Sequence, residues 1–357
     1  MRVALGLLML ALAAAPSAVA PTGSMSNPRA AHSATLLPSG EVLIAGGCTV
    51  DSCELDRHGA ETELFDPRTG RFRRGPNLLR PRVSHAAVTL PDGKILIAAG
   101  YTGGSGPAAT TELYDPQTNA VRAGPSMRTP RDGFTVTPLG RGHFLFAGGT
   151  RGGQVVASAE IFDAATQRFR RTGSMHTPRS AHSATRLAGG RVLIAGGSNA
   201  NDVVLASTEI YNPRTGRFSR GPRMTIPRYK HAAVALRGGG VLVVGGSDSR
   251  DFFGRYASAE RYDPRSRRFR RVGAMAEARS KLPDAVVSLP SGRVVVAGGG
   301  ASVEAYDPRS RRFRRVGRMG TTLAFSTATL LSDGRVLIVG GYDDRIRVSR
   351  SAWLITP

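Results

Sequence analysis

The chain has 357 residues, and its 49 Lys and Arg residues outnumber 26 Asp and Glu residues, which gives a formal net charge of +23. Two cysteines are too few for a disulfide-rich mini-scaffold, and the 44 glycines lack the every-third-residue period of collagen. The apolar runs described below exclude a disordered chain, and the length fits two domains or one large β fold.

The first element in chain order is a targeting segment. Arg2 precedes an uncharged, mostly apolar stretch at residues 3–15, followed by small residues. This pattern is typical of a secretory signal peptide and is too short for a membrane span. We expect residues 1–15 to be a signal peptide, with its boundary between residues 13 and 20. The alternative is an N-terminal segment of the core.

One unit then recurs seven times. Each copy has a β-branched run that ends in a glycine pair, such as residues 41–45 before Gly46-Gly47, with Ala99-Gly100 as a degenerate copy. The second glycines lie 42 to 53 residues apart. A turn signal precedes each run, and a second hairpin follows it with two aromatic residues seven positions apart, such as Phe65 and Phe72. Each unit therefore predicts four short strands.

Such units bury a face only against neighbouring units, and closing them into a ring shelters their strand edges. The succession of a glycine pair, a tyrosine and a second aromatic (Gly196-Gly197, Tyr211 and Phe218) resembles the kelch repeat, although Phe stands where kelch units usually carry Trp. The resemblance implies an all-β, seven-bladed kelch-type β-propeller with four antiparallel strands per blade. We expect residues 16–357 to form this single domain.

The seventh unit ends at Pro357 without its fourth strand. Residues 22–25 repeat the sequence of residues 172–175, which places Val19 in the slot of an outer-strand aromatic. We therefore expect residues 17–22 to close the last blade, because an open ring would leave a free edge. Residues 18–20 also fit a signal-peptidase site, but cleavage there would remove the strand. A mature start near Ala14 or Ala15 preserves it.

Arginine and glutamate recur together. Six units carry both, at Arg29, Arg82, Arg131, Arg179, Arg228 and Arg279, and at Glu63, Glu112, Glu160, Glu209, Glu260 and Glu304. The seventh has Leu323 and Ser351 instead. This joint loss favours Arg–Glu pairs within or between blades, because a lone buried charge is costly. The alternative is a ligand-binding role.

Histidines lie three residues after four of these arginines, at His32, His85, His182 and His231. We expect a repeated structural hydrogen bond, and we predict no metal site there. Cys48 and Cys53 lie in one loop, and we expect a disulfide between them in an exported protein. A free thiol or a metal ligand is the alternative.

Arginines also gather on the predicted outermost strands, where they would form a cationic belt. The belt includes Arg73, Arg74, Arg170, Arg171, Arg270, Arg271, Arg314 and Arg315. Such charges protect strand edges, and they also attract polyanions such as acidic glycans or lipid headgroups. No aromatic side chains interleave the belt, so we expect no specific recognition of nucleic acid.

The loops after the glycine pairs vary most among the seven units and share one predicted face. Variable loops on rigid strands are the usual layout of a binding surface. The candidate binding residues are Asp51, Arg57, His58, Tyr101, Arg151, Asp202, Arg250, Phe252, Phe253, Tyr256, Asp343 and Asp344. The Phe252-Phe253 pair is the best candidate for an anchor.

No common catalytic motif is present, so we identify no catalytic residue and predict no cofactor. The sequence favours an exported binding scaffold, in the periplasm, at the cell surface or outside the cell. Its partner would be a protein or a glycan, with no membrane span. The alternatives are polyanion adhesion through the belt and a carbohydrate-active enzyme. Galactose oxidase and a sugar mutarotase share the kelch-type propeller, but the oxidase needs copper held by two Tyr and two His, with one Tyr crosslinked to a Cys.

Overall fold

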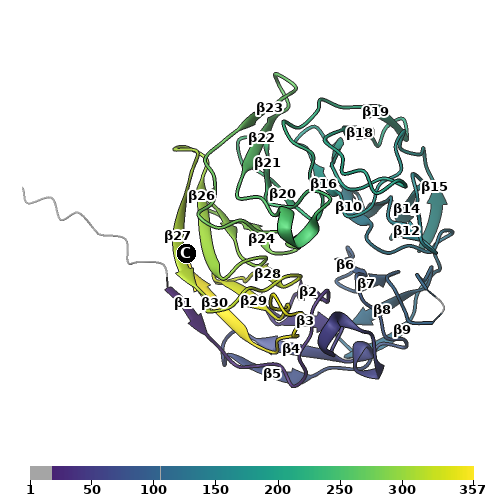
Figure 1. Cartoon of the computed structure of the whole chain (residues 1–357). Coiled ribbons are helices and arrows are strands. Elements are labelled where there is room, and N and C mark those ends of the chain that lie inside the picture. Colours follow the sequence, from purple (N-terminus) through teal and green to yellow (C-terminus); the bar gives the residue numbers. More distant parts are fainter. Residues whose placement is uncertain (1–17, 105) are drawn as a thin grey trace, which may run out of the picture.

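The computed structural model describes residues 18–104 and 106–357. Seven four-stranded antiparallel sheets surround a central axis (Figure 1). The expected signal peptide at residues 1–15 lies outside the described residues. No helix in the described part of the chain is long and apolar enough to cross a membrane.

Six blades are built from strands in chain order, with the separate hairpin of β12 (Thr150–Arg151) and β13 (Gln154–Val155) inserted in the third blade. Blade 1 contains β2 (Ser33–Leu36), β3 (Val42–Ala45), β4 (Thr62–Asp66) and β5 (Arg71–Arg74); blade 2 contains β6 (Ala86–Thr89), β7 (Ile95–Ala98), β8 (Thr111–Asp115) and β9 (Ala120–Ala123); blade 3 contains β10 (Thr135–Gly140), β11 (His143–Ala147), β14 (Ala159–Asp163) and β15 (Arg168–Arg171). Blade 4 contains β16 (Ser183–Arg186), β17 (Val192–Ala195), β18 (Thr208–Asn212) and β19 (Arg217–Arg220); blade 5 contains β20 (Ala232–Ala235), β21 (Val241–Val244), β22 (Ala259–Asp263) and β23 (Arg268–Arg271); blade 6 contains β24 (Val286–Ser288), β25 (Val294–Val296), β26 (Ser302–Asp307) and β27 (Arg312–Arg318).

Blade 7 joins the two ends of the chain. It contains β28 (Thr327–Leu330), β29 (Val336–Val339), β30 (Ala352–Thr356) and β1 (Ala18–Pro21). Val19 of β1 lies opposite Ile355 of β30. The predicted closure by the N-terminal segment is therefore confirmed.

The core is divided among the seven seams between blades. Each seam holds its own apolar cluster with residues from both neighbours; at the seam of blades 1 and 2, for example, Leu43 and Leu64 pack with Ile97 and Tyr114. The second strand of each blade is buried on both sides, which explains its continuous apolar sequence. Blades thus stabilise one another, and ring closure adds the last seam.

The remaining elements lie in the loops after the glycine pairs. They are the 3-10 helices η1 (Asp51–Cys53), η2 (Arg57–Ala60) and η3 (Asp251–Gly254), and the hairpin of β12 (Thr150–Arg151) and β13 (Gln154–Val155). Together with the connections between blades, these loops form one face of the ring, which we call the loop face. Figure 1 views this face.

Candidate functional site: the loop face and the central channel

The glycine pairs set how closely neighbouring blades approach. Gly46 has a φ of 67°, and a Cβ at this position would lie 2.6 Å from the carbonyl oxygen of Arg82 in blade 2. The N–H of Gly47 donates to this same oxygen at 2.9 Å. An equivalent bond joins each blade to the next at all seven seams. The pair therefore allows a backbone contact that a side chain would block.

The six repeated arginines form buried ion pairs inside their own blades. Arg82 Nη2 lies 2.6 Å from Glu112 Oε1, with both side chains at most 2% exposed. The same arginine donates to the carbonyl oxygens of Ala99 and Thr110, and Glu112 accepts the N–H of Leu79. The six pairs are Arg29–Glu63, Arg82–Glu112, Arg131–Glu160, Arg179–Glu209, Arg228–Glu260 and Arg279–Glu304. The predicted pairing is confirmed, and its role is to fix the connections of the loop face.

The four repeated histidines bridge neighbouring blades. His85 Nε2 lies 2.9 Å from the Oγ of Ser33 in the preceding blade. Equivalent contacts join His32 to Thr327, His182 to Thr135 and His231 to Ser183. Burial lowers the pKa of His85 and His231 to about 3, so both rings are neutral at neutral pH. The expected structural hydrogen bond is confirmed.

The residues that oxidase-type copper chemistry requires do not converge. Each of the four histidines contacts a hydroxyl group at a different seam, and the two cysteines are bonded to each other. In residues 18–104 and 106–357, no group of three or more His, Cys, Asp and Glu side chains is placed to hold a metal ion. Because Cys48 and Cys53 are bonded to each other, neither is free for the Tyr–Cys crosslink of a galactose oxidase centre, and the four repeated histidines are distributed over four seams.

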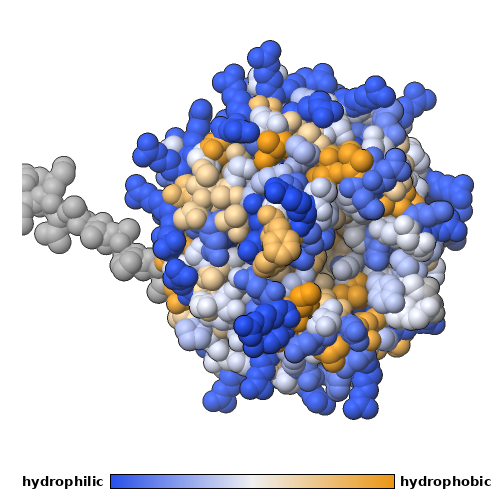
Figure 2. Space-filling view, in the orientation of Figure 1, coloured by the Kyte–Doolittle hydropathy of each residue, from blue (hydrophilic) through white to orange (hydrophobic). Residues whose placement is uncertain are grey.

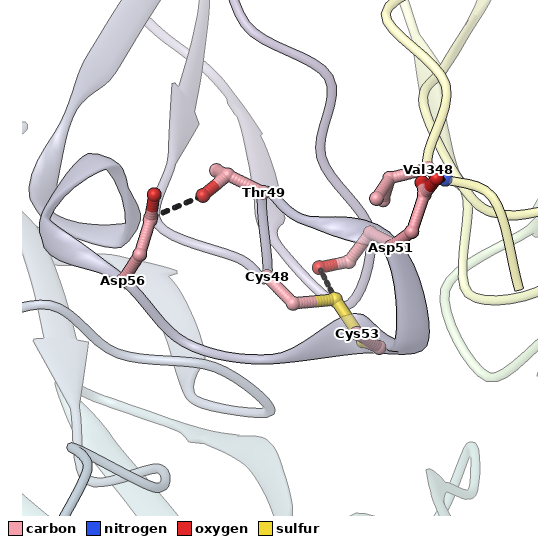
Figure 3. Close-up of a disulfide and its surroundings, with 7 residues drawn as sticks. Cys48, Thr49, Asp51, Cys53, Asp56 and Val348 are labelled. Carbon is pink, nitrogen blue, oxygen red and sulfur yellow. Dashed lines mark hydrogen bonds between the residues drawn. A yellow bond between two sulfur atoms is a disulfide. The ribbon is translucent and has the colours of Figure 1, made fainter.

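The predicted disulfide between Cys48 and Cys53 is present and ties down the loop of blade 1 (Figure 3). Both cysteines pack against a small apolar cluster that includes Tyr342 of blade 7. Asp51 Oδ1 accepts the N–H of Val348 at 3.0 Å, also from blade 7. The loops of blades 7 and 1 are therefore joined across the seam that closes the ring.

Seven equivalent residues surround the mouth of the central channel. They are Ala31, Ser84, Gly133, Ala181, Lys230, Lys281 and Phe325, and all have φ between 49° and 58°. Backbone hydrogen bonds link neighbours in this ring, such as Lys281 N–H to the Lys230 carbonyl at 2.8 Å. Asp251 Oδ2 lies 3.0 Å from Lys230 Nζ and 3.2 Å from Lys281 Nζ. These two ion pairs hold the blade 5 loop beside the channel mouth.

The channel itself is a cavity of about 610 Å³ lined mainly by Ala, Ser and Thr of the inner strands. Asp132 and Asp284 also line it, and removal from bulk water raises the pKa of both carboxyl groups. Val286 occupies in β24 the pairing position that Ala34 occupies in β2. The interval from Arg279 to Val286 is two residues longer than the equivalent interval from Arg29 to Ala34, and Asp284 belongs to this insertion. Sequence reasoning missed this residue, although the lengthened interval after Arg279 was a visible signal.

The twelve predicted binding residues all lie on the loop face, but several of them fix the loops themselves. Arg250 pairs with Asp248 at 2.7 Å, Asp343 with Arg347 at 2.6 Å, Asp344 with Arg255 at 3.5 Å and His58 with Glu61 at 2.8 Å. Tyr256 packs near Arg228, with the guanidinium carbon 5.5 Å from the ring centroid. Arg57, Tyr101, Arg151 and Asp202 remain exposed.

The two adjacent phenylalanines differ in environment. The guanidinium of Arg255 lies over the ring of Phe252, with its carbon 4.1 Å from the centroid. Phe253 is 87% exposed. Of the two rings, Phe253 therefore projects into solvent, a distinction that the sequence did not make.

Exposed apolar side chains are concentrated on this face. In the described part of the chain, the large apolar residues that are more than a third exposed are Val50, Leu79, Tyr101, Val203, Phe253 and Ile346. Five lie in loops after glycine pairs, and Leu79 lies in the connection from blade 1 to blade 2. Sequence analysis had selected only Tyr101 and Phe253, because burial of a loop side chain depends on contacts that repeats do not encode.

The predicted arginine belt occupies the rim. Arg73, Arg74, Arg170, Arg171, Arg270, Arg271, Arg314 and Arg315 lie on outermost strands and are exposed. Figure 2 shows hydrophilic side chains projecting around the rim. Of these eight, Arg73 pairs with Glu41 at 2.9 Å.

Known proteins support this architecture. Residues 82–128 and 179–225 match the Kelch motif, and these segments begin at Arg82 and Arg179 of blades 2 and 4. A solved structure described as a novel fungal alcohol oxidase of the AA5 family, in complex with copper, aligns with a TM-score of 0.72 at 16% identity. The alignment covers 96% of this chain and 76% of that chain, and at this identity it shows the fold alone. No curated protein matches. The chain is a seven-bladed β-propeller in which two segments match the Kelch motif.

Proposed function

We propose that this propeller is an exported binding scaffold whose loop face holds a partner protein or glycan. The observation that carries the proposal is the placement of the six exposed large apolar side chains, all on that face. Exposed apolar residues rimmed by polar ones are typical of interaction sites. The disulfide supports export, because such bonds persist in oxidising compartments.

The loops that would form this surface are held in place. The loop of blade 5 is fixed to that of blade 7 by Arg255 and Asp344, and the loop of blade 7 to that of blade 1 by Val348 and Asp51. A surface that is ordered before binding loses less conformational entropy when its partner docks. These contacts favour binding by a preformed face.

The test is an array of glycans and envelope proteins probed with the mature chain at two salt concentrations. Binding through the loop face should persist at high salt and should be lost in a Phe253→Ser, Leu79→Ser variant. Ala188→Ser, in an exposed turn of the opposite face, is the matched control and should bind as the wild type does. A ligand that both variants bind equally well would contradict the proposal.

The central channel favours a second candidate, a carbohydrate-active enzyme of the mutarotase type. Carboxyl groups with raised pKa values that line a cavity, such as those of Asp132 and Asp284, are suited to proton transfer. The test is the rate at which sugar anomers interconvert in the presence of the protein. Activity that disappears in Asp284→Asn would favour this candidate, and an unchanged rate would exclude a role for that residue.

A further inference from the structure

The rim of blades 5 and 6 carries an unusual density of guanidinium groups. Seven exposed arginines lie on the outermost strands β23 and β27. Leaving out Arg318 at the end of β27, we call the other six the arginine sector: Arg268, Arg270, Arg271, Arg312, Arg314 and Arg315. Within the described part of the chain, none of the six forms an ion pair, whereas Arg73 on the rim of blade 1 pairs with Glu41. Asp263 and Asp307 lie opposite Arg268 and Arg312 without forming ion pairs, so the sector keeps a net positive charge.

Arg261, beside the sector, places two like charges opposite each other and so lowers the stability of the isolated fold. Arg270 of β23 lies directly opposite Arg261 of β22. The positions equivalent to Arg261 hold Leu64 in blade 1 and Ile161 in blade 3. Like charges directly opposite each other in a sheet are destabilising. Blade 5 thus places a repelling cation where other blades place an aliphatic side chain.

The cations of the two blades meet at one seam. Burial raises the pKa of Tyr306, while Arg261 of blade 5 and Arg311 of blade 6 both act in the opposite direction. Both guanidinium groups are therefore close to the same phenol. The hydroxyl of Tyr306 is buried and has no hydrogen-bond partner among the described residues. Arg261 and Arg311 thus place positive charge from both blades near this seam.

We propose that the arginine sector binds a polysaccharide that carries carboxylate groups, that is, a polyuronate. Guanidinium groups match carboxylates through two parallel hydrogen bonds, and an acidic chain would relieve the repulsion between Arg261 and Arg270. The site lies on the rim, so it is independent of the loop face and of the function proposed for it.

The surroundings of the sector favour a polysaccharide over other polyanions. Phe269 of β23 is buried and Phe313 of β27 is half-buried, so neither offers a stacking surface for the bases of nucleic acid. In the described part of the chain, the exposed large apolar side chains lie on the loop face and none lies on the rim, which disfavours insertion of the rim into a lipid bilayer.

The experiment measures binding of polygalacturonate to the mature chain at low and high salt. In the wild type, each contact between an arginine and the acidic chain releases bound counterions and so favours binding. A variant with all six sector arginines replaced by Gln lacks these contacts, and its affinity should fall by on the order of tenfold or more. The control replaces six exposed rim arginines of blades 1, 3 and 4 by Gln, namely Arg71, Arg74, Arg168, Arg170, Arg171 and Arg217. It has the same net charge and should lose less than about threefold. Equal losses in the two variants would overturn the proposal.

A single substitution separates binding from folding. Arg261→Leu restores the aliphatic residue found in blade 1, so it should raise the melting temperature while weakening polygalacturonate binding severalfold. Unchanged affinity in this variant would contradict a role for Arg261. Duplex DNA and vesicles of anionic lipid are tested in parallel, and tighter binding of either than of polygalacturonate would also overturn the proposal.

Discussion

Arg179 Nη2 lies 3.1 Å from Glu209 Oε1, and both side chains are at most 2% exposed. Arg179 Nη1 also donates to the carbonyl oxygen of Gly196 at 2.8 Å, while Glu209 accepts the N–H groups of His176 and Thr177. One pair thus connects the glycine pair, strand β18 and the connection that enters blade 4. Its contribution is structural, and it holds the base of the loop face.

Removing one partner should therefore be costly. Glu209→Ala leaves a buried guanidinium without its carboxylate, and we expect a loss of about 3–5 kcal/mol in the free energy of unfolding, measured by urea denaturation. The double variant Arg179→Leu, Glu209→Ser copies the solution of blade 7, where Leu323 and Ser351 occupy these positions. It should recover much of the loss. A double variant less stable than Glu209→Ala would show that the pair adds more than charge compensation.

Most of the fold was predictable because seven copies in one chain serve as comparisons. The joint replacement of arginine and glutamate in blade 7 indicated the buried pairs, and the missing fourth strand indicated closure by residues near Val19. The loops have no such copies. The sequence alone did not reveal that Asp251 bridges Lys230 and Lys281, or that Arg255 covers Phe252 and leaves Phe253 exposed. These contacts depend on the path of one long loop.

Under the export proposed above, closure by β1 sets where the mature chain must begin. Val19 packs into the apolar cluster shared by blades 6 and 7, where a Cβ on Gly317 would lie 2.5 Å from it. A chain that starts at Pro21 should lose roughly 3 kcal/mol or more, because it loses the burial of Val19 and the hydrogen bonds of β1 to β30. We expect mass spectrometry of the exported protein to find a first residue upstream of Ala18. A mature protein that begins at Pro21 with an unchanged melting temperature would contradict this prediction.

The buried histidines should make stability depend on pH. The pKa of His231 is about 3 in the folded chain and about 6.5 in an unfolded one, so the unfolded state binds a proton first as pH falls. The contribution of neutral His231 to the free energy of unfolding is therefore fully present above pH 6.5 and decreases as the pH falls from 6.5 to about 3. At pH 5 the loss from this residue should be about 2 kcal/mol relative to pH 8. His231→Gln, which keeps a partner for Ser183, should show a smaller loss over this range in urea denaturation. An identical pH dependence in the variant and the wild type would exclude His231 as a source.

The disulfide closes a short loop, so its effect should be local. Chain-entropy arguments limit the contribution of so short a loop to about 2 kcal/mol. The bond holds η1 against the apolar cluster that contains Tyr342, and η1 carries Asp51, which accepts the N–H of Val348. Cys48→Ser, Cys53→Ser should therefore lower the melting temperature only slightly while speeding amide hydrogen exchange at Val348 and in residues 48–54. Thr62 and Glu63 of β4, in the same blade, serve as internal controls and should keep their protection. Faster exchange throughout blade 1 would show instead that the bond supports the whole sheet.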